Sequence, residues 1–371
     1  MAKLKNINGH FVESDYENAL ISFLEREGWQ YLFGDSIKRA NRKEVLYMED
    51  LLQFLKENNK NVKDEELQRI ADNVRLVGAD TDFATLHKVY KWMIDGISAV
   101  NKKGEPVTVR LIDFEKIDNN IFRVVNQFTV EYINNGVTKT RRPDVLLYVN
   151  GMPVCVIELK NPADANATIE DAWEQINIRY WRDIPGLLHY CPLACISDGV
   201  KTRLGTVRTP YEHFYAWRRV ENGDKVSTMP FDELETMVRG VYRPERFLEI
   251  FRDYVYFQDE NFDSDEKEIV CRYPQFFATR LLRESVIKSV KTKSGKVWPS
   301  RSLNRKYKNL SIVCSYFSAQ IRRVNQKHDV RIILVLLKQL PIVATCNLKT
   351  IQKAITRIIV FADIVVHSFL A

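Results

Sequence analysis

The sequence predicts an α/β protein, an α+β arrangement in which helices flank a mixed β-sheet, and three observations support this. Two nearly continuous apolar runs, RPDVLLYV (142–149) and PVCVIELK (153–160), are typical of strands that are covered on both faces. Asn150–Gly151 lies between them and is a strong signal for a β-hairpin. Segments with helical periodicity precede and follow the hairpin, at 15–27 and 167–184. The predicted order is helix, three antiparallel strands, helix and strand.

The part of the chain before the hairpin is predicted to be mainly helical. Apolar residues recur at helical spacing over 15–27, and Ser14 and Glu17 precede them at the spacing of a capping box. Similar apolar stripes predict helices within 45–75 and 82–100. No internal repeat or low-complexity linker separates these segments.

Strands and helices alternate in the rest of the body. The segment 121–133 is rich in β-branched and aromatic residues and ends at the turn residues 134–136, which predicts the first strand of the sheet. The segment 192–198 predicts a buried strand, and 208–220 predicts a further strand. An amphipathic helix is predicted over 244–257.

Length and composition describe an ordinary globular protein. The 371 residues suffice for two or three domains, and 45% hydrophobic and 28% charged residues are near the average. Residues 1–6 are polar and lead into no signal-peptide core, and no run of about 18 apolar residues is present that would span a membrane. Cys191 and Cys195 have no second pair at the spacing of a zinc site. We therefore expect a cytoplasmic protein with reduced thiols.

The net charge of +7 is unevenly distributed along the chain. Residues 300–371 carry 12 Lys and Arg against 2 Asp and Glu, whereas the remainder carries 43 against 46. The body of the protein is therefore slightly acidic, and any contact that it makes with nucleic acid must come from a local site.

Three charged residues in the apolar hairpin mark a candidate site. Asp144 lies on the first strand segment, and Glu158 and Lys160 lie two apart on the second, so these two share a face. Such residues are costly to bury unless they pair with or bind something. Carboxylates can hold Mg²⁺, which generates hydroxide and screens a phosphate, and a lysine can orient the attacking water and offset transition-state charge. The competing interpretation is a buried lysine–carboxylate salt bridge without function.

The register of the hairpin decides whether the carboxylates meet. A two-residue loop alone would place Asp144 and Glu158 on opposite faces of the sheet. We therefore predict a three-residue connection, 150–152, which pairs residue 149 with 153 and 144 with 158. A bulge within either strand would restore the same pairing.

The amino-acid sequence around the hairpin resembles that of a known protein family. The stretches VRLIDF, NNIFRVVNQFTV, RRPDVLLYVNGMPVCVIELKNP, EQINIRYWRDIP, CISDGVKTRLGT and RYPQFFATRLLRES occur in order over about residues 10–296. They are similar to the restriction (R) subunit of type I restriction-modification enzymes, and RPD…IELK is similar to the PD-(D/E)xK nuclease motif. The resemblance implies a PD-(D/E)xK restriction-endonuclease-like core with flanking helices.

This resemblance also implies roles for the hairpin residues. It implies a Mg²⁺-dependent endonuclease in which Asp144 and Glu158 are metal ligands and Lys160 is the catalytic lysine. The carbonyl of Leu159 is a further implied ligand.

Four other residues match positions of the family less closely. Glu17 matches an acidic metal-site residue on the first helix, although it is equally the capping-box partner of Ser14. Gln175 matches the glutamine of a glutamine–tyrosine motif. The family spacing of that motif is four, whereas Tyr180 is five residues away, so either a π-bulge brings the two together or Tyr180 is a core aromatic. Gln275 resembles an adenine-reading glutamine at the entrance to the family's motor, although an exposed helical residue is the better interpretation without the motor.

The motor of the family is not recognisable here. VKTKSGKVWPS lacks the Gly-x-x-x-x-Gly-Lys-Ser/Thr phosphate loop, so we expect no ATP site. We expect a nuclease domain over 1–225, a helical linker and incomplete start of the motor over 226–299, and a basic, glycine-free tail over 300–371. The tail suggests a truncated or frameshifted gene, and a basic helical extension is the alternative.

Two functions remain open from the sequence. The first is the Mg²⁺-dependent nuclease part of a type I restriction enzyme, which would act on double-stranded DNA together with methylation and specificity subunits. The second is a cleavage-inactive remnant that only docks on the methyltransferase core.

Overall fold

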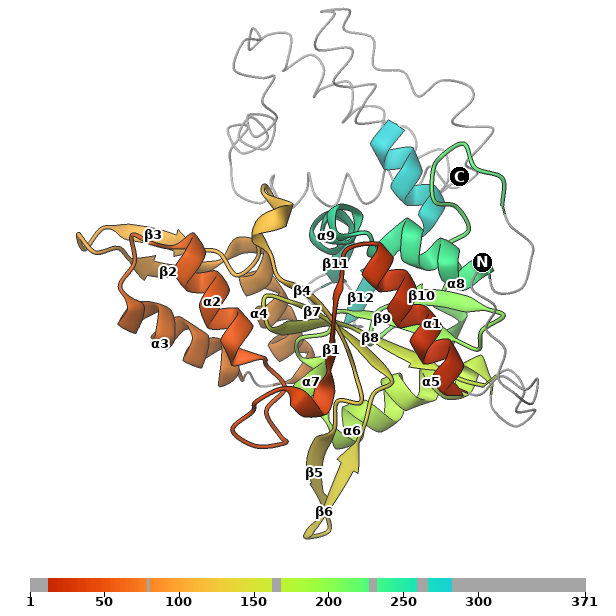
Figure 1. The fold of residues 1–371 in the computed structure, drawn as a ribbon, viewed down its shortest axis with the longest axis horizontal. Coiled ribbons are helices and arrows are strands. Elements are labelled where there is room, and N and C mark those ends of the chain that lie inside the picture. The colour runs from red at the N-terminus through yellow and green to blue at the C-terminus, as the bar shows by residue number, and fades with distance from the viewer. Residues whose placement is uncertain (1–12, 79–80, 162–167, 227–231, 259–265, 282–371) are drawn as a thin grey trace, which may run out of the picture. The chain divides into compact units, whose positions relative to one another are not determined.

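The computed structural model describes residues 13–78, 81–161, 168–226, 232–258 and 266–281 (Figure 1). The chain divides into two compact units, residues 1–270 and 271–371. In the second unit the described part is 271–281, which is helical from residue 273. The basic tail predicted over 300–371 lies outside the described residues, and the domain boundaries at 225 and 299 stay predictions.

A six-stranded mixed sheet is the centre of the first unit, which confirms the α/β class. The strand order is β1-β4-β7-β8-β9-β10, and the pairs β1–β4 and β8–β9 are parallel whereas the others are antiparallel. Every residue of β7, β8 and β9 is buried, as their continuous apolar runs predict. The strands are β1 Gln30–Phe33, β4 Phe122–Asn126, β7 Val145–Val149, β8 Met152–Leu159, β9 Leu193–Ser197 and β10 Thr202–Gly205.

Helices flank this sheet, and three separate two-stranded sheets extend from it (Figure 1). The α-helices are α1 Glu13–Arg26, α2 Met48–Asn58, α3 Asp64–Arg75, α4 Asp82–Asp95, α5 Ile169–Glu174, α6 Trp181–Asp183, α7 Pro185–Leu188, α8 Asp232–Met237 and α9 Pro244–Asp253. The 3₁₀ helices are η1 Gly34–Ser36, η2 Ile117–Asn119 and η4 Tyr211–His213, and the π-helices are η3 Gln175–Tyr180 and η5 Val238–Tyr242. The small sheets pair β2 Ile97–Val100 with β3 Pro106–Val109, β5 Val130–Asn134 with β6 Val137–Arg141, and β11 Val255–Gln258 with β12 Lys267–Val270.

The helix predicted over 82–100 is wrong at its end. Gly96, with φ +80°, follows α4, and the next residues form β2. A Cβ atom at Gly96 would lie 2.7 Å from the carbonyl oxygen of Val109, so the close approach of β3 requires glycine here.

The single strand predicted over 121–133 is also wrong. It is interrupted at Gln127, which has φ +53°, so β4 lies in the central sheet and β5 starts a separate hairpin. Asn135 and Gly136 both have positive φ and form the tip of that hairpin.

Two predictions in the second half need correction. The segment 208–220 is not a strand: it holds the short helix η4 and a single bridge between Leu204 and Tyr215. The helix predicted over 244–257 ends at Asp253, and β11 follows it.

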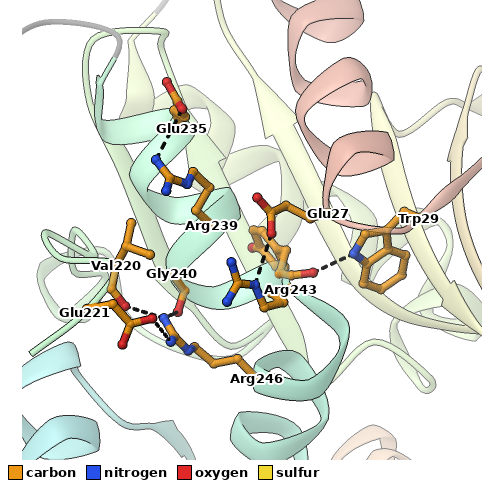
Figure 2. Close-up of polar contacts among 10 residues, drawn as sticks. Glu27, Trp29, Val220, Glu221, Glu235, Arg239, Gly240, Arg243 and Arg246 are labelled. Carbon is orange, nitrogen blue, oxygen red and sulfur yellow. Dashed lines mark hydrogen bonds and ion pairs between the residues drawn. The ribbon is translucent and has the colours of Figure 1, made fainter. Parts of the chain in front are cut away.

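Contacts of Arg246 and Trp29 join η5 and α9 to the segments that precede α8 and follow α1 (Figure 2). Arg246 is buried, donates to the carbonyl groups of Val220 and Gly240, and pairs with Glu221 at 2.7 Å. The indole Nε1 of Trp29 donates to the carbonyl of Tyr242 at 2.6 Å. These contacts hold η5 and α9 against the neighbouring chain segments.

The β7–β8 hairpin has a two-residue loop, so the predicted three-residue connection is wrong. Val149 pairs with Met152, and Asn150 and Gly151 have φ +51° and +76°. The register then shifts between the pairs Leu147–Cys155 and Tyr148–Pro153, which is a β-bulge with one extra residue in β8. The bulge restores the pairing of Asp144 with Glu158, as the alternative prediction of a bulge stated.

Candidate functional site

The site lies where β7 begins and β8 ends. Asp144 directly precedes β7, and Glu158 and Leu159 are the last residues of β8. Because Val145 pairs with Ile157, Asp144 stands opposite Glu158. Asp144 is close enough to raise the pKa of the Glu158 carboxyl, after the larger effect of burial, and the backbone N–H of Leu159 donates to Asp144 Oδ2 at 2.7 Å. The structure therefore brings the two carboxyl groups together.

Gln175 connects the lysine to this carboxyl pair. Lys160 Nζ donates to Gln175 Oε1 at 2.8 Å. The amide nitrogen of Gln175 donates to Glu158 Oε2 at 2.6 Å and to the hydroxyl oxygen of Tyr180 at 2.8 Å. Tyr180 in turn donates to Glu158 Oε1 at 2.6 Å. Glu158 is thus held through both oxygens.

A π-helix explains how residues five apart reach the same carboxylate. Residues Gln175–Tyr180 form η3, between α5 and α6. The wider i→i+5 turn returns to the same side after five residues, so Gln175 and Tyr180 both face Glu158. Of the two predicted possibilities, the structure shows the π-bulge, and Tyr180 is also buried at 1% exposure.

Burial dominates the electrostatics of the site. The Glu158 side chain is fully buried, which raises the pKa of its carboxyl well above the usual range, and the neighbouring Asp144 raises that pKa further. The Lys160 ammonium and the hydrogen bond from Tyr180 oppose this rise. Burial and Glu158 likewise raise the pKa of Tyr180, so its hydroxyl stays protonated as a donor.

Glu17 belongs to a neighbouring network. Its Oε1 accepts a hydrogen bond from Asn126 Nδ2 at 2.5 Å and one from Gln127 Nε2 at 3.2 Å. Within the described residues, no three or more His, Cys, Asp or Glu side chains gather as a metal-binding group, and a role of Glu17 as a metal ligand stays a prediction.

The capping-box interpretation of Glu17 does not fit α1. That helix already includes Glu13, so Ser14 lies inside it and is not its N-cap. The contacts of Glu17 with the amides of Asn126 and Gln127 were not predicted. Gln127 has a left-handed backbone, and nothing in the sequence signals that conformation.

Gln275 lies in the second unit. Its Oε1 accepts a hydrogen bond from the backbone N–H of Arg272 at 2.8 Å, at the start of the helix there. This contact is typical of a residue in the first turn of a helix. A role of Gln275 in reading adenine stays a prediction.

No helix among the described residues has the length and apolar character that crossing a membrane requires.

Comparison with known proteins identifies the family of the chain. Residues 10–213, more than half of the chain, match the family described as "Type I restriction enzyme R protein N terminus (HSDR_N)".

The similar curated proteins are named as endonuclease subunits. The chain is 29% identical to the "Putative type I restriction enzyme MjaIXP endonuclease subunit" of Methanocaldococcus jannaschii, over 75% of this chain and 28% of that protein. It is 28% identical to the "Type I restriction enzyme HindI endonuclease subunit" of Haemophilus influenzae, over 74% of this chain and 27% of that protein. It is 25% identical to the "Type I restriction enzyme EcoprrI endonuclease subunit" of Escherichia coli, over 77% of this chain and 87% of that protein.

The chain therefore spans little more than a quarter of the length of the first two relatives. The match over residues 10–213 shows that the chain belongs to the family of type I restriction enzyme R protein N-terminal regions.

Proposed function

We propose that this chain is the Mg²⁺-dependent DNA endonuclease part of a type I restriction-modification R subunit, with a PD-(D/E)xK core. One observation carries the proposal: Asp144 and Glu158 meet at the end of two paired strands, with Lys160 held beside them by Gln175. A carboxylate pair that can hold a metal ion, with an adjacent lysine that can stabilise negative charge, suits metal-assisted phosphodiester hydrolysis.

The residues present fit a Mg²⁺ ion. Burial, and then the neighbouring Asp144, raise the pKa of Glu158, and a bound cation would oppose this rise. Mg²⁺ is usually bound by one or two carboxylates and keeps several waters. The N–H of Leu159 points toward Asp144, and in a β-strand the carbonyl of the same residue points to the same side. Asp144, Glu158 and the Leu159 carbonyl would therefore hold the ion, and Glu17 stays a proposed outer residue.

Each side chain has a distinct proposed role. A bound Mg²⁺ would supply an activated water and offset phosphate charge. Lys160 places an ammonium beside the carboxylates, where it can orient water and stabilise negative charge that develops on the phosphate. Gln175 fixes the ammonium through its carbonyl oxygen and fixes Glu158 through its amide nitrogen. Tyr180 holds the second oxygen of Glu158, so the carboxylate cannot rotate away.

Double-stranded DNA is the proposed substrate, and methylation and specificity subunits are the proposed partners. The similar proteins are named as endonuclease subunits of type I restriction enzymes, which supports this choice. A module that docks on the methyltransferase core without cleavage activity is the second candidate.

The test is a plasmid-nicking assay with Mg²⁺, performed on the chain alone and on the chain with its methylation and specificity subunits. We expect Mg²⁺-dependent nicking that EDTA abolishes and that Lys160→Ala lacks. Stable binding to the partner subunits with no nicking under either condition would favour the docking module instead.

A further inference from the structure

A basic surface flanks the candidate site although the body of the protein is slightly acidic. It consists of the loop after η1, residues 38–43 (KRANRK), and of the β5–β6 hairpin with the residue that follows it, 130–142. Figure 1 shows this hairpin projecting away from the central sheet. We refer to the two segments together as the basic arm.

Both ends of the hairpin start at the candidate site. β4 ends at Asn126, which pairs with Val145, the residue after Asp144, and β5 begins four residues later at Val130. β6 ends at Arg141, and only Arg142 and Pro143 separate it from Asp144. The hairpin is thus continuous in sequence with the carboxylate that β7 positions.

Hydrogen bonds and a cation–ring contact hold the loop against the hairpin and the residues that precede it. Arg39 Nη2 donates to the carbonyl of Thr129 at 3.0 Å, and its guanidinium lies 4.0 Å from the ring centroid of Phe128. The N–H of Glu131 donates to the carbonyl of Arg42 at 3.0 Å. The loop and the hairpin therefore form one surface and not two independent segments.

A tight turn presents two of the cations. Asn41 Oδ1 accepts hydrogen bonds from the N–H groups of Lys43 and Glu44, at 2.9 and 3.2 Å. This is the turn that an Asx side chain stabilises, and it places Arg42 and Lys43 at its centre, both exposed.

The exposed cations of the arm are not neutralised by the protein itself. Within the part of the chain that the structure describes, none of the five takes part in an ion pair; they are Lys38, Arg42, Lys43, Lys139 and Arg142. Arg141 differs, because it pairs with the buried Asp183 and so anchors the hairpin to α6. The acidic residues closest in sequence to these cations are Glu44, next to Lys43, Asp144, two residues after Arg142, and Asp35, three residues before Lys38.

We propose that the basic arm is the surface that holds the phosphate backbone of duplex DNA next to the candidate site. This inference deepens the proposed function and rests on it for the choice of DNA. Five-residue strands extend about 17 Å, and B-DNA carries one phosphate charge per about 1.7 Å of axis, so the arm matches roughly five base pairs. The contact is with phosphates, so it positions the duplex and is independent of base sequence.

The first test is a lysine footprint on the full chain. Lysines are acetylated with and without a 30-base-pair duplex, in EDTA so that no cleavage occurs, and modification is quantified by mass spectrometry. We expect the duplex to protect Lys38, Lys43 and Lys139. Two exposed lysines on other elements, Lys91 and Lys103, should stay as reactive as in the free chain.

The second test is charge reversal followed by fluorescence anisotropy with the same duplex. The triple variant Lys38→Glu, Arg42→Glu and Lys43→Glu leaves the structural Arg39 in place. Each lost phosphate contact lowers the slope of log K against log salt by about 0.9, so the slope should fall by about 2 to 3 and affinity by tenfold or more. The matched control reverses Lys91, Lys103 and Lys116, which also lie at the surface.

The outcomes separate this inference from the proposed nuclease. Protection of the arm together with weakened binding of the triple variant supports the surface, even if the nicking assay shows no cleavage. Protection of Lys91 and Lys103 equal to that of the arm would overturn it. So would equal DNA affinity of the triple variant and its control, or protection of the arm by partner subunits and not by DNA.

Discussion

Gln175→Met tests whether the lysine must be held in place for cleavage. Methionine is close to glutamine in size but offers neither the carbonyl oxygen that accepts from Lys160 nor the amide that donates to Glu158. A hydrogen bond to a charged group contributes about 1.5–3 kcal/mol, and the substitution removes two such bonds. In the proposed mechanism Gln175 positions the lysine and does not touch the phosphate, so we expect only part of this energy to be lost from the transition state. We expect cleavage to slow by about 10- to 100-fold, which is roughly 1.4–2.8 kcal/mol.

The assay is the initial rate of plasmid nicking by the complex with partner subunits, combined with a double-mutant cycle. If Gln175 acts through Lys160, adding Gln175→Met to Lys160→Ala should cost little beyond Lys160→Ala alone. Gln68→Met on the exposed face of α3 is the matched control and should cleave normally. Fully additive losses, or cleavage by Gln175→Met at the parental rate, would refute the reasoning.

Three further predictions concern the same site, and a fourth concerns ATP binding. Asp144→Ala and Lys160→Ala should each abolish cleavage in the complex while circular dichroism shows an intact fold; nicking at the parental rate would exclude these roles. Because the folded pKa of Glu158 is raised, the stability that its protonated form contributes is fully present below its ordinary pKa and is lost as pH rises through the folded pKa. Guanidinium unfolding of the metal-free chain should therefore show a smaller loss of stability from pH 5 to pH 8 in Glu158→Gln, and identical pH slopes would contradict this. Tyr180→Phe removes a hydrogen bond that lowers the pKa of Glu158, so the pH profile of cleavage should move to higher pH, whereas an unmoved profile would argue against that contact. Calorimetry with ATP·Mg²⁺ at physiological salt should show no saturable micromolar binding, since the sequence carries no phosphate-binding loop motif; such binding would reveal a motor site in the C-terminal third.

The sequence was most informative where side-chain pattern and burial agree. The apolar runs of β7, β8 and β9 predicted buried strands, and all three lie in the central sheet. The charged residues inside those runs predicted a site, because burial without a partner would be costly. The structure gathers Asp144, Glu158 and Lys160 at that place, and their catalytic roles stay proposals.

Backbone detail could not be predicted in the same way. Gln127 adopts a left-handed conformation, which glycine would signal but glutamine does not, so the division into β4 and β5 was missed. The segment 208–220 has the aromatic composition of a strand, but Pro210 begins a tight turn there and only one bridge forms. Amino-acid composition indicates whether a segment suits a partly buried strand. The point at which the chain changes direction depends instead on tertiary contacts.

The bulge and the π-helix were predictable only as alternatives. Both insert one residue. The bulge was one of two predicted ways to bring Asp144 and Glu158 to one face, and the π-bulge was one of two interpretations of Tyr180, the other being a core aromatic. The two-residue loop is stabilised by Asn150, whose side chain bonds Leu111, Asn120 and Ile121, so tertiary contacts fixed the loop and left the bulge to set the register.

The π-helix has a consequence for recognising distant relatives of this chain. Gln175 and Tyr180 face one carboxylate although five residues separate them, and an ordinary α-helix brings residues four apart to one side equally well. A search pattern that fixes the interval would discard chains whose chemistry is unchanged. A helix can thus gain or lose a single residue between two functional positions and leave both in place, provided that the local winding changes with it. Spatial facing, and not spacing along the chain, is the property to compare among such proteins.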